Sequence, residues 1–157
     1  GDPRNESNQL GPLARSDLRE HLHQQVTDSV NAGARCILGG DLPAGGGFFY
    51  PPTLLLDVQP GMPVFEEETF GPVLSMMTFR TPNEVIQRAN NTPYGLSAGV
   101  WTQKGSKIFA MTQKLNAGVL WANTYNKFDP ASPFGGYKES GFGREGGVQG
   151  LAAYVKL

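Results

Sequence analysis

The chain has 157 residues, of which 39% are hydrophobic and 17% charged, and this composition is typical of a folded globular domain and excludes a disordered chain. The net charge of −1 gives no global field that would favour nucleic acid or an anionic membrane surface. No stretch approaches the roughly 18 consecutive apolar residues of a membrane span, and we expect no signal peptide. The single cysteine, Cys36, excludes an internal disulfide and fits a reducing compartment, so we expect a cytoplasmic location.

The first half of the chain predicts one helix and three strands. After an extended lead-in over residues 1–15, a helix should begin near Ser16 as its N-cap and end at Gly33. An apolar stripe of residues four apart faces its core, namely Leu18, Leu22, Val26 and Val30. The predicted strands are short apolar segments that follow this helix, at residues 35–38, 52–58 and 72–79.

The second half alternates helices with strands. Thr81-Pro82-Asn83-Glu84 is a capping box, so a helix should run from there to about Asn91. A strand at 97–102, a helix at 105–116 and a strand at 119–123 follow. From residue 72 onward this order predicts βαβ units, and thus an α/β fold with a parallel, Rossmann-like sheet.

A glycine-rich loop follows the last predicted strand. Six of the fifteen residues over 133–147 are glycine, with aromatic and charged residues between them. Such a run cannot be the interior of a helix or strand, and its aromatic residues make it a poor flexible linker. Because ligands in open α/β sheets bind beyond the carboxyl ends of the strands, we expect a site at this loop.

Three motifs resemble the C-terminal part of the aldehyde dehydrogenase superfamily, the NAD(P)-dependent enzymes that oxidise aldehydes to acids. They are Glu66-Glu67-Glu68-Thr69-Phe70-Gly71-Pro72-Val73, Ala89-Asn90-Asn91-Thr92-Pro93-Tyr94-Gly95-Leu96, and Pro133-Phe134-Gly135-Gly136-Tyr137-Lys138-Glu139-Ser140-Gly141 with Gly143-Arg144-Glu145. The resemblance covers nearly the whole chain. It implies that residues 1–157 are the C-terminal part of the catalytic domain, and that 148–157 lead into a C-terminal oligomerisation strand.

The nucleophilic cysteine and the base glutamate of that family lie upstream of the region that this chain resembles. Cys36 matches a core strand and not the nucleophile motif, so there is no catalytic cysteine here. The resemblance implies that the chain alone is inactive, and we expect it to be a fragment. The aldehyde, and the choice between NAD and NADP, are set largely outside it.

The resemblance assigns Glu68 and Phe70 to the nicotinamide ribose. A carboxylate can accept hydrogen bonds from two ribose hydroxyls, and an aromatic face can pack against the nicotinamide. The alternative is that Glu66-Glu67-Glu68 is only a solvated acidic turn.

Phe128 and Phe134 take positions that line the aldehyde channel in the family, where aromatic walls exclude water and hold the substrate. The alternative is ordinary loop packing. Asn123 and Tyr125 could also approach the channel.

The resemblance gives Glu145 an accessory catalytic role, as part of a relay toward the base. The alternative is a structural ion pair at a subunit interface. We treat Arg144 as structural and Lys138 as a surface or interface charge. His21, His23 and Cys36 have no recognisable metal-ligand spacing, so we expect no metal.

The resemblance thus implies an aldehyde as substrate, the rest of the enzyme chain as a partner, and a homodimer or homotetramer as the assembly. We expect no nucleic-acid or membrane partner. A non-catalytic module of the same family, used for binding or scaffolding, is the first alternative. An independent α/β domain with an unrelated binding function is the second.

Overall fold

The computed structural model describes residues 1–156. Contacts divide the chain into two compact units, Gly1–Thr78 and Phe79–Leu157. The sequence itself predicts a single domain without a linker. The division falls in the segment between a strand that pairs inside the first unit and a helix that begins the second.

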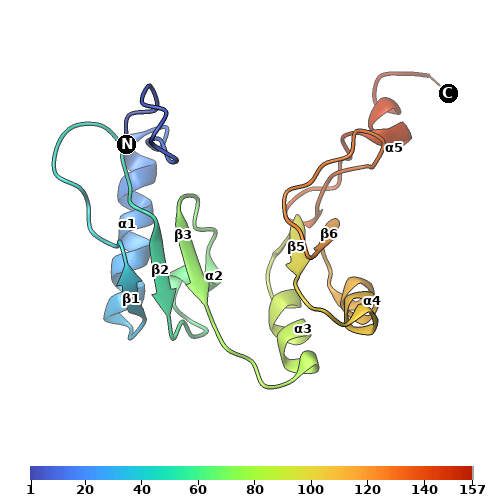
Figure 1. Cartoon of the computed structure of the whole chain (residues 1–157), viewed down its shortest axis with the longest axis horizontal. Coiled ribbons are helices and arrows are strands. Elements are labelled where there is room, and N and C mark those ends of the chain that lie inside the picture. The colour runs from blue at the N-terminus through green and yellow to red at the C-terminus, as the bar shows by residue number, and fades with distance from the viewer. Residues whose placement is uncertain (157) are drawn as a thin grey trace. The chain divides into compact units, whose positions relative to one another are not determined.

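The first unit is a helix packed on a three-stranded sheet (Figure 1). Strand β2 lies in the centre, antiparallel to β1 and parallel to β3, with Leu54 opposite Leu74 in the parallel pair. The three strand predictions are confirmed within a few residues. The elements of this unit are α1 (Ser16–Asn31), β1 (Arg35–Leu38), β2 (Thr53–Leu56), α2 (Pro63–Glu66) and β3 (Val73–Met76).

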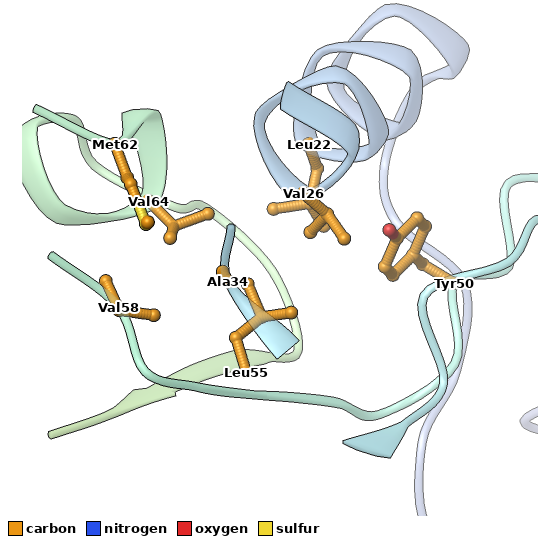
Figure 2. Close-up of a cluster of buried hydrophobic side chains, with 8 residues drawn as sticks. All are labelled: Leu22, Val26, Ala34, Tyr50, Leu55, Val58, Met62 and Val64. Carbon is orange, nitrogen blue, oxygen red and sulfur yellow. The ribbon is translucent and has the colours of Figure 1, made fainter. Parts of the chain in front are cut away.

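The core of this unit lies between α1 and the sheet (Figure 2). Leu22 and Val26 of α1 are fully buried and point toward Leu55 of β2. The predicted stripe is correct in the middle of α1, but Leu18 is only half-buried and Val30 is exposed. The buried face instead includes two polar residues, Gln25 and Ser29.

The predicted N-cap of α1 is wrong by one residue. Ser16 is the first helical residue, and Arg15 occupies the N-cap position without a capping side chain. The Arg15 guanidinium bonds to the Asp17 carboxylate, with Nε donating to Oδ1 at 2.9 Å, and this hydrogen bond lowers the pKa of Asp17 to about 2. Within residues 1–156, α1 therefore begins without a side-chain cap, and the Arg15–Asp17 ion pair lies beside its first turn.

The second unit contains the βαβ unit that the sequence predicts. Strands β5 and β6 are parallel, with Ser97 opposite Val119, and α4 connects them. The strand at Val73–Met76, expected to continue this pattern, pairs with β2 in the first unit. The elements of the second unit are α3 (Pro82–Asn90), β4 (Tyr94–Gly95), β5 (Ser97–Val100), α4 (Gly105–Lys114), β6 (Val119–Ala122), β7 (Tyr137–Lys138) and α5 (Gly147–Leu151).

Helix α3 begins as its sequence predicts. The Thr81 hydroxyl accepts a hydrogen bond from the Glu84 N–H at 3.2 Å, and Pro82 occupies the first turn. The Glu84 carboxylate in turn accepts from the Arg80 N–H at 2.8 Å and pairs with Arg88 at 3.0 Å. The capping box therefore satisfies backbone donors that the helix leaves free.

The last element of the chain that the structure describes is a short helix and not a strand. Residues 147–151 form the short helix α5, and a turn follows over residues 152–154. The predicted approach of residues 148–157 to an oligomerisation strand stays a prediction, and Leu157 lies outside the described residues. Within residues 1–156, no helix has the length and apolar character that a membrane crossing needs.

Candidate functional site

The structure separates the three adjacent glutamates of residues 66–68. Glu66 accepts a hydrogen bond from the Gly61 N–H at 2.7 Å, and Glu67 accepts one from Gln25 Nε2 at 2.8 Å. The exposed Glu68 carboxylate has no hydrogen bond or ion pair within the part of the chain that the structure describes. Within the described chain, two of the three carboxylates are therefore committed to the fold, and the Glu68 carboxylate is left available to a ligand.

The backbone of this loop, residues 67–72, is tightly held. The Glu68 carbonyl accepts a hydrogen bond from Gln25 Nε2 at 3.2 Å, and the Thr53 N–H donates to the Pro72 carbonyl at 2.8 Å. Gly71 packs so closely on α1 that a Cβ there would lie 2.4 Å from Leu22 Cδ2. The loop cannot move away from the core without breaking these contacts.

The Phe70 side chain is the other available group on this loop. It is 69% exposed, and it directly precedes Gly71, which packs against Leu22. A free carboxylate and an exposed aromatic ring two residues apart can accept hydrogen bonds from hydroxyls and pack against a flat ring. We call Glu68 and Phe70, with the backbone that holds them, the acidic loop.

In the second unit, five aromatic side chains form a continuous chain. Their ring centroids are 6.4 Å apart for Trp101–Tyr125, 5.0 Å for Trp121–Tyr125, 5.8 Å for Trp121–Phe128 and 5.0 Å for Phe128–Phe134. The last three pairs are edge-to-face, a favourable arrangement of aromatic quadrupoles. Trp121 is 7% exposed, and its Nε1 donates to the Lys127 carbonyl at 2.8 Å. The buried indole therefore fixes the loop that carries Phe128.

An open pocket of about 410 Å³ lies beside this aromatic chain, with Phe128, Pro130, Phe134 and Glu145 among the residues that line it. Phe134 and Glu145 exchange backbone hydrogen bonds of 2.7 Å in both directions. The structure therefore brings together the two predicted channel residues and the predicted accessory glutamate. Glu145 is exposed, and its carboxylate has no partner within residues 1–156. Its accessory role and the alternative ion pair at a subunit interface both stay predictions.

Arg144 organises the glycine-rich loop. Its Nη1 donates to the carbonyls of Gly136 and Gly143, each at 2.8 Å, and its guanidinium lies 4.8 Å from the centroid of the Tyr137 ring. Arginine suits this position because its planar group can donate several hydrogen bonds while it stacks on an aromatic ring. The role is structural, as the sequence suggested.

The motif at residues 89–96 and the glycine-rich loop lie side by side. Strands β4 and β7 pair antiparallel, with Gly95 opposite Tyr137, and the Gly95 N–H donates to Ser140 Oγ at 3.0 Å. Lys138 Nζ donates to the carbonyls of Asn90 and Thr92 at 2.8 and 2.9 Å. Lys138, expected to be a surface or interface charge, therefore ties this loop to the end of α3.

Asn90 is a structural residue that sequence reasoning missed. Its Nδ2 donates to the Lys114 carbonyl at 2.7 Å, and its Oδ1 accepts from the Asn116 N–H at 2.8 Å. One side chain thus completes hydrogen bonds at the end of α4 from the end of α3. Its place in the Asn90-Asn91-Thr92-Pro93 motif was the available signal.

Asn123 and Tyr125 were expected near the aldehyde channel. The Asn123 amide bonds to the backbone of Thr102, accepting from its N–H at 2.8 Å and donating to its carbonyl at 3.1 Å. Its polar atoms are therefore committed to linking the ends of β5 and β6. Tyr125 belongs to the aromatic chain, between Trp101 and Trp121.

The histidines and the cysteine lie in the first unit. His21 Nε2 is 3.9 Å from the Glu67 carboxylate, His23 Nδ1 is 3.3 Å from the Tyr50 hydroxyl, and Cys36 Sγ is 3.3 Å from the Leu38 carbonyl. Among residues 1–156 there is no group of three or more histidine, cysteine, aspartate or glutamate side chains that could hold a metal ion. These residues therefore have local structural partners.

Known proteins match the chain along its whole length. The model of the aldehyde dehydrogenase family matches residues 1–157. The succinate semialdehyde dehydrogenase (NAD(P)+) Sad of Escherichia coli is 43% identical over 157 residues, which are 100% of this chain and 34% of that protein. This chain thus spans about a third of that relative.

Solved structures of aldehyde dehydrogenases also match nearly the whole chain. The NAD-dependent aldehyde dehydrogenase of Sinorhizobium meliloti matches with a TM-score of 0.94 and 40% identity, over 98% of this chain and 31% of that one. An NAD+ complex of an aldehyde dehydrogenase from Bacillus cereus matches with a TM-score of 0.92 and 40% identity, over 97% and 31%. The predicted α/β, Rossmann-like fold class is confirmed. This chain belongs to the aldehyde dehydrogenase family.

Proposed function

We propose that this chain is the C-terminal part of an enzyme that oxidises an aldehyde to a carboxylic acid with NAD or NADP. The chain carries the acidic loop for the nicotinamide ribose and the aromatic pocket for the aldehyde. This proposal rests on one observation: among the three adjacent glutamates, Glu68 is the one whose carboxylate has no partner within residues 1–156, and it lies on a loop whose backbone is fixed. The family membership and the order of the motifs support this assignment.

The acidic loop fits the nicotinamide end of a dinucleotide. Bound NAD or NADP supplies the hydride acceptor for the oxidation. Glu68 is exposed and unpaired in the described chain, so its carboxylate can accept hydrogen bonds from two ribose hydroxyls without losing a protein partner. Phe70 presents an exposed ring on the same loop, which can limit the rotation of the nicotinamide. Both residues act by orienting the reactive ring.

The aromatic pocket fits an apolar or aromatic aldehyde. Phe128 and Phe134 line it, and their rings meet edge-to-face with centroids 5.0 Å apart. Walls of this kind exclude water and restrict the orientations of a carbonyl substrate. The Glu145 carboxylate borders the same pocket, and we propose an accessory role for it in proton transfer.

The chain alone is proposed to be inactive. Its one cysteine, Cys36, lies on the core strand β1 with its thiol directed at the Leu38 carbonyl, and its sequence context does not match the nucleophile motif of the family. The nucleophile and the base therefore come from the rest of the enzyme, in a cytoplasmic dimer or tetramer. Turnover of an aldehyde by the isolated chain would contradict this part of the proposal.

The test of the acidic loop compares two isosteric substitutions in the intact protein. Glu68→Gln should slow the pre-steady-state formation of NAD(P)H by roughly tenfold or more, with a smaller effect on cofactor affinity, because the lost interaction orients the reactive ring. Glu66→Gln is the matched control, since a glutamine can still accept the hydrogen bond from the Gly61 N–H. Equal rates in Glu68→Gln and the wild type would refute the role of Glu68.

NAD(P)H formation by the intact protein also distinguishes an enzyme from a non-catalytic binding module. A non-catalytic binding module of this family would bind NAD(P) but form no NAD(P)H with any aldehyde. Turnover by the intact protein excludes that alternative.

A further inference from the structure

We propose that Gln25 is a positioning residue for Glu68, and that the reaction depends on this buried glutamine although it touches neither cofactor nor substrate. The inference rests on the proposed function of Glu68. It starts from the position of Gln25 on α1, between residues of the hydrophobic core, and from the two hydrogen bonds that the side chain donates to the acidic loop.

Gln25 is an unusual residue for its place in the helix. It is 2% exposed, and its neighbours on the same face, Leu22 and Val26, belong to the core. A polar side chain is costly at such a position unless its hydrogen-bonding groups have partners. Gln25 therefore needs hydrogen-bond partners, which the apolar side chains of the core cannot provide.

The partners of Gln25 are two consecutive residues of the acidic loop. Nε2 donates to Glu67 Oε2 at 2.8 Å and to the Glu68 carbonyl at 3.2 Å. Both partners are acceptors, so only the amino end of the amide can face them. Oε1 is buried and has no partner within residues 1–156. Gln25 is thus specialised as a double donor, and half of its hydrogen-bonding capacity is left unused.

This double contact holds the loop on one side of Glu68, and Gly71 holds it on the other. Gly71 lies against Leu22, the residue three positions before Gln25 on α1. One face of α1 therefore fixes the backbone at both ends of residues 68–70. The exposed Glu68 side chain has no partner of its own in the described chain, so its direction depends on that backbone. Loss of the Gln25 donor frees the end that carries Glu68.

The closing experiment uses the intact enzyme and compares Gln25→Leu with Gln24→Leu. Gln24 is the adjacent glutamine on the same helix, exposed, with its Nε2 donating to Asp28 Oδ1 at 2.7 Å. Amide hydrogen exchange of residues 66–71 is measured without cofactor, and the rate of hydride transfer is measured with it. Gln25→Met gives a second apolar replacement if the leucine variant does not fold.

Gln25→Leu should speed exchange at residues 66–71 by roughly tenfold and slow hydride transfer by a similar factor, the size expected for the loss of the two hydrogen bonds that Gln25 donates. Gln24→Leu should change neither the exchange at residues 66–71 nor the rate of hydride transfer. Glu67→Gln keeps an acceptor for Gln25 and should also leave both near their wild-type values. In a Glu68→Ala background, Gln25→Leu should slow hydride transfer no further, because Glu68 is the group through which it acts.

Three results would overturn the inference. If Glu68→Ala slows hydride transfer while Gln25→Leu changes neither readout, Glu68 keeps its role and Gln25 has none. If Gln25→Leu slows the reaction equally in the Glu68→Ala background, its role is structural. If Glu68→Ala itself has no effect on hydride transfer, the proposed function of Glu68 fails, and the inference fails with it.

Discussion

Gly118 gives the sharpest test of how the glycine-rich loop is held. A Cβ at this position would lie 1.6 Å from the Gly135 carbonyl oxygen, 2.7 Å from the Gly135 carbonyl carbon and 3.1 Å from Gly136 Cα. These are backbone atoms, so no side-chain rotation can relieve the clash. Gly118→Ala must therefore push the loop and the start of β6 apart.

The loss of stability caused by Gly118→Ala depends on the contacts that hold the glycine-rich loop against the start of β6. An ordinary van der Waals contact is about 3.5 Å, so the backbones would have to separate by roughly 2 Å. The Gly118 N–H donates to the Gly95 carbonyl at 3.0 Å, and Arg144 holds Gly136 from the loop side. Overpacking costs about 1–3 kcal/mol, and we expect the upper end, about 3 kcal/mol, because both sides are backbone.

Urea denaturation of the intact protein measures this change against Gly143→Ala. Gly143 lies in the same loop, but a Cβ at this position would meet no heavy atom within 4 Å beyond its chain neighbours, so alanine there should change the free energy of unfolding by only about 0.5 kcal/mol. Phe134 precedes Gly135, so Gly118→Ala should also weaken aldehyde binding. Equal stability of the two variants would refute the close contact between β6 and the loop.

Two further predictions concern single elements. Thr81→Ala removes the acceptor for the Glu84 N–H and should lower the free energy of unfolding by about 1 kcal/mol, whereas Thr81→Ser should not; urea denaturation measures both. Burial raises the pKa of Tyr50 to about 12, while an unfolded tyrosine ionises near pH 10. The stability gained from the neutral phenol is therefore complete below about pH 10 and is lost as the pH rises toward 12. Relative to Tyr50→Phe, the wild type should lose stability only in that window, which denaturation at several pH values measures.

The elements that local chemistry defines could be predicted from the sequence. The capping box at Thr81–Glu84 specifies a helix start through contacts within four residues, and the structure confirms it. The apolar runs predicted the strands in the same way, because a buried strand needs only a short continuous segment. The N-cap expected at Ser16 was wrong by one residue, because α1 already includes Ser16 and its first turn has no side-chain capping bond within residues 1–156 that the sequence could specify.

The elements that depend on tertiary contacts could not be predicted. Strands β4 and β7 have two residues each, and they exist only because the segments around Gly95 and Tyr137 meet. The role of Gln25 likewise comes from residues 42 and 43 positions away. A polar residue on an apolar stripe was the one signal available, and a sequence cannot say what such a residue bonds to.

The acidic loop and the aromatic pocket are held in the same way. Each offers a ligand an exposed side chain, Glu68 in one and Phe128 in the other, and a buried polar group holds the backbone that carries it. Gln25 does this for Glu68, and the Trp121 indole N–H does it for the loop of Phe128. Substitution of an exposed residue removes a ligand contact, whereas substitution of its buried anchor leaves the contact group present but misdirected. A loss of rate with little loss of affinity for the ligand concerned, the cofactor for Gln25 and the aldehyde for Trp121, is therefore the signature expected of both residues, and it separates them from residues that serve stability alone.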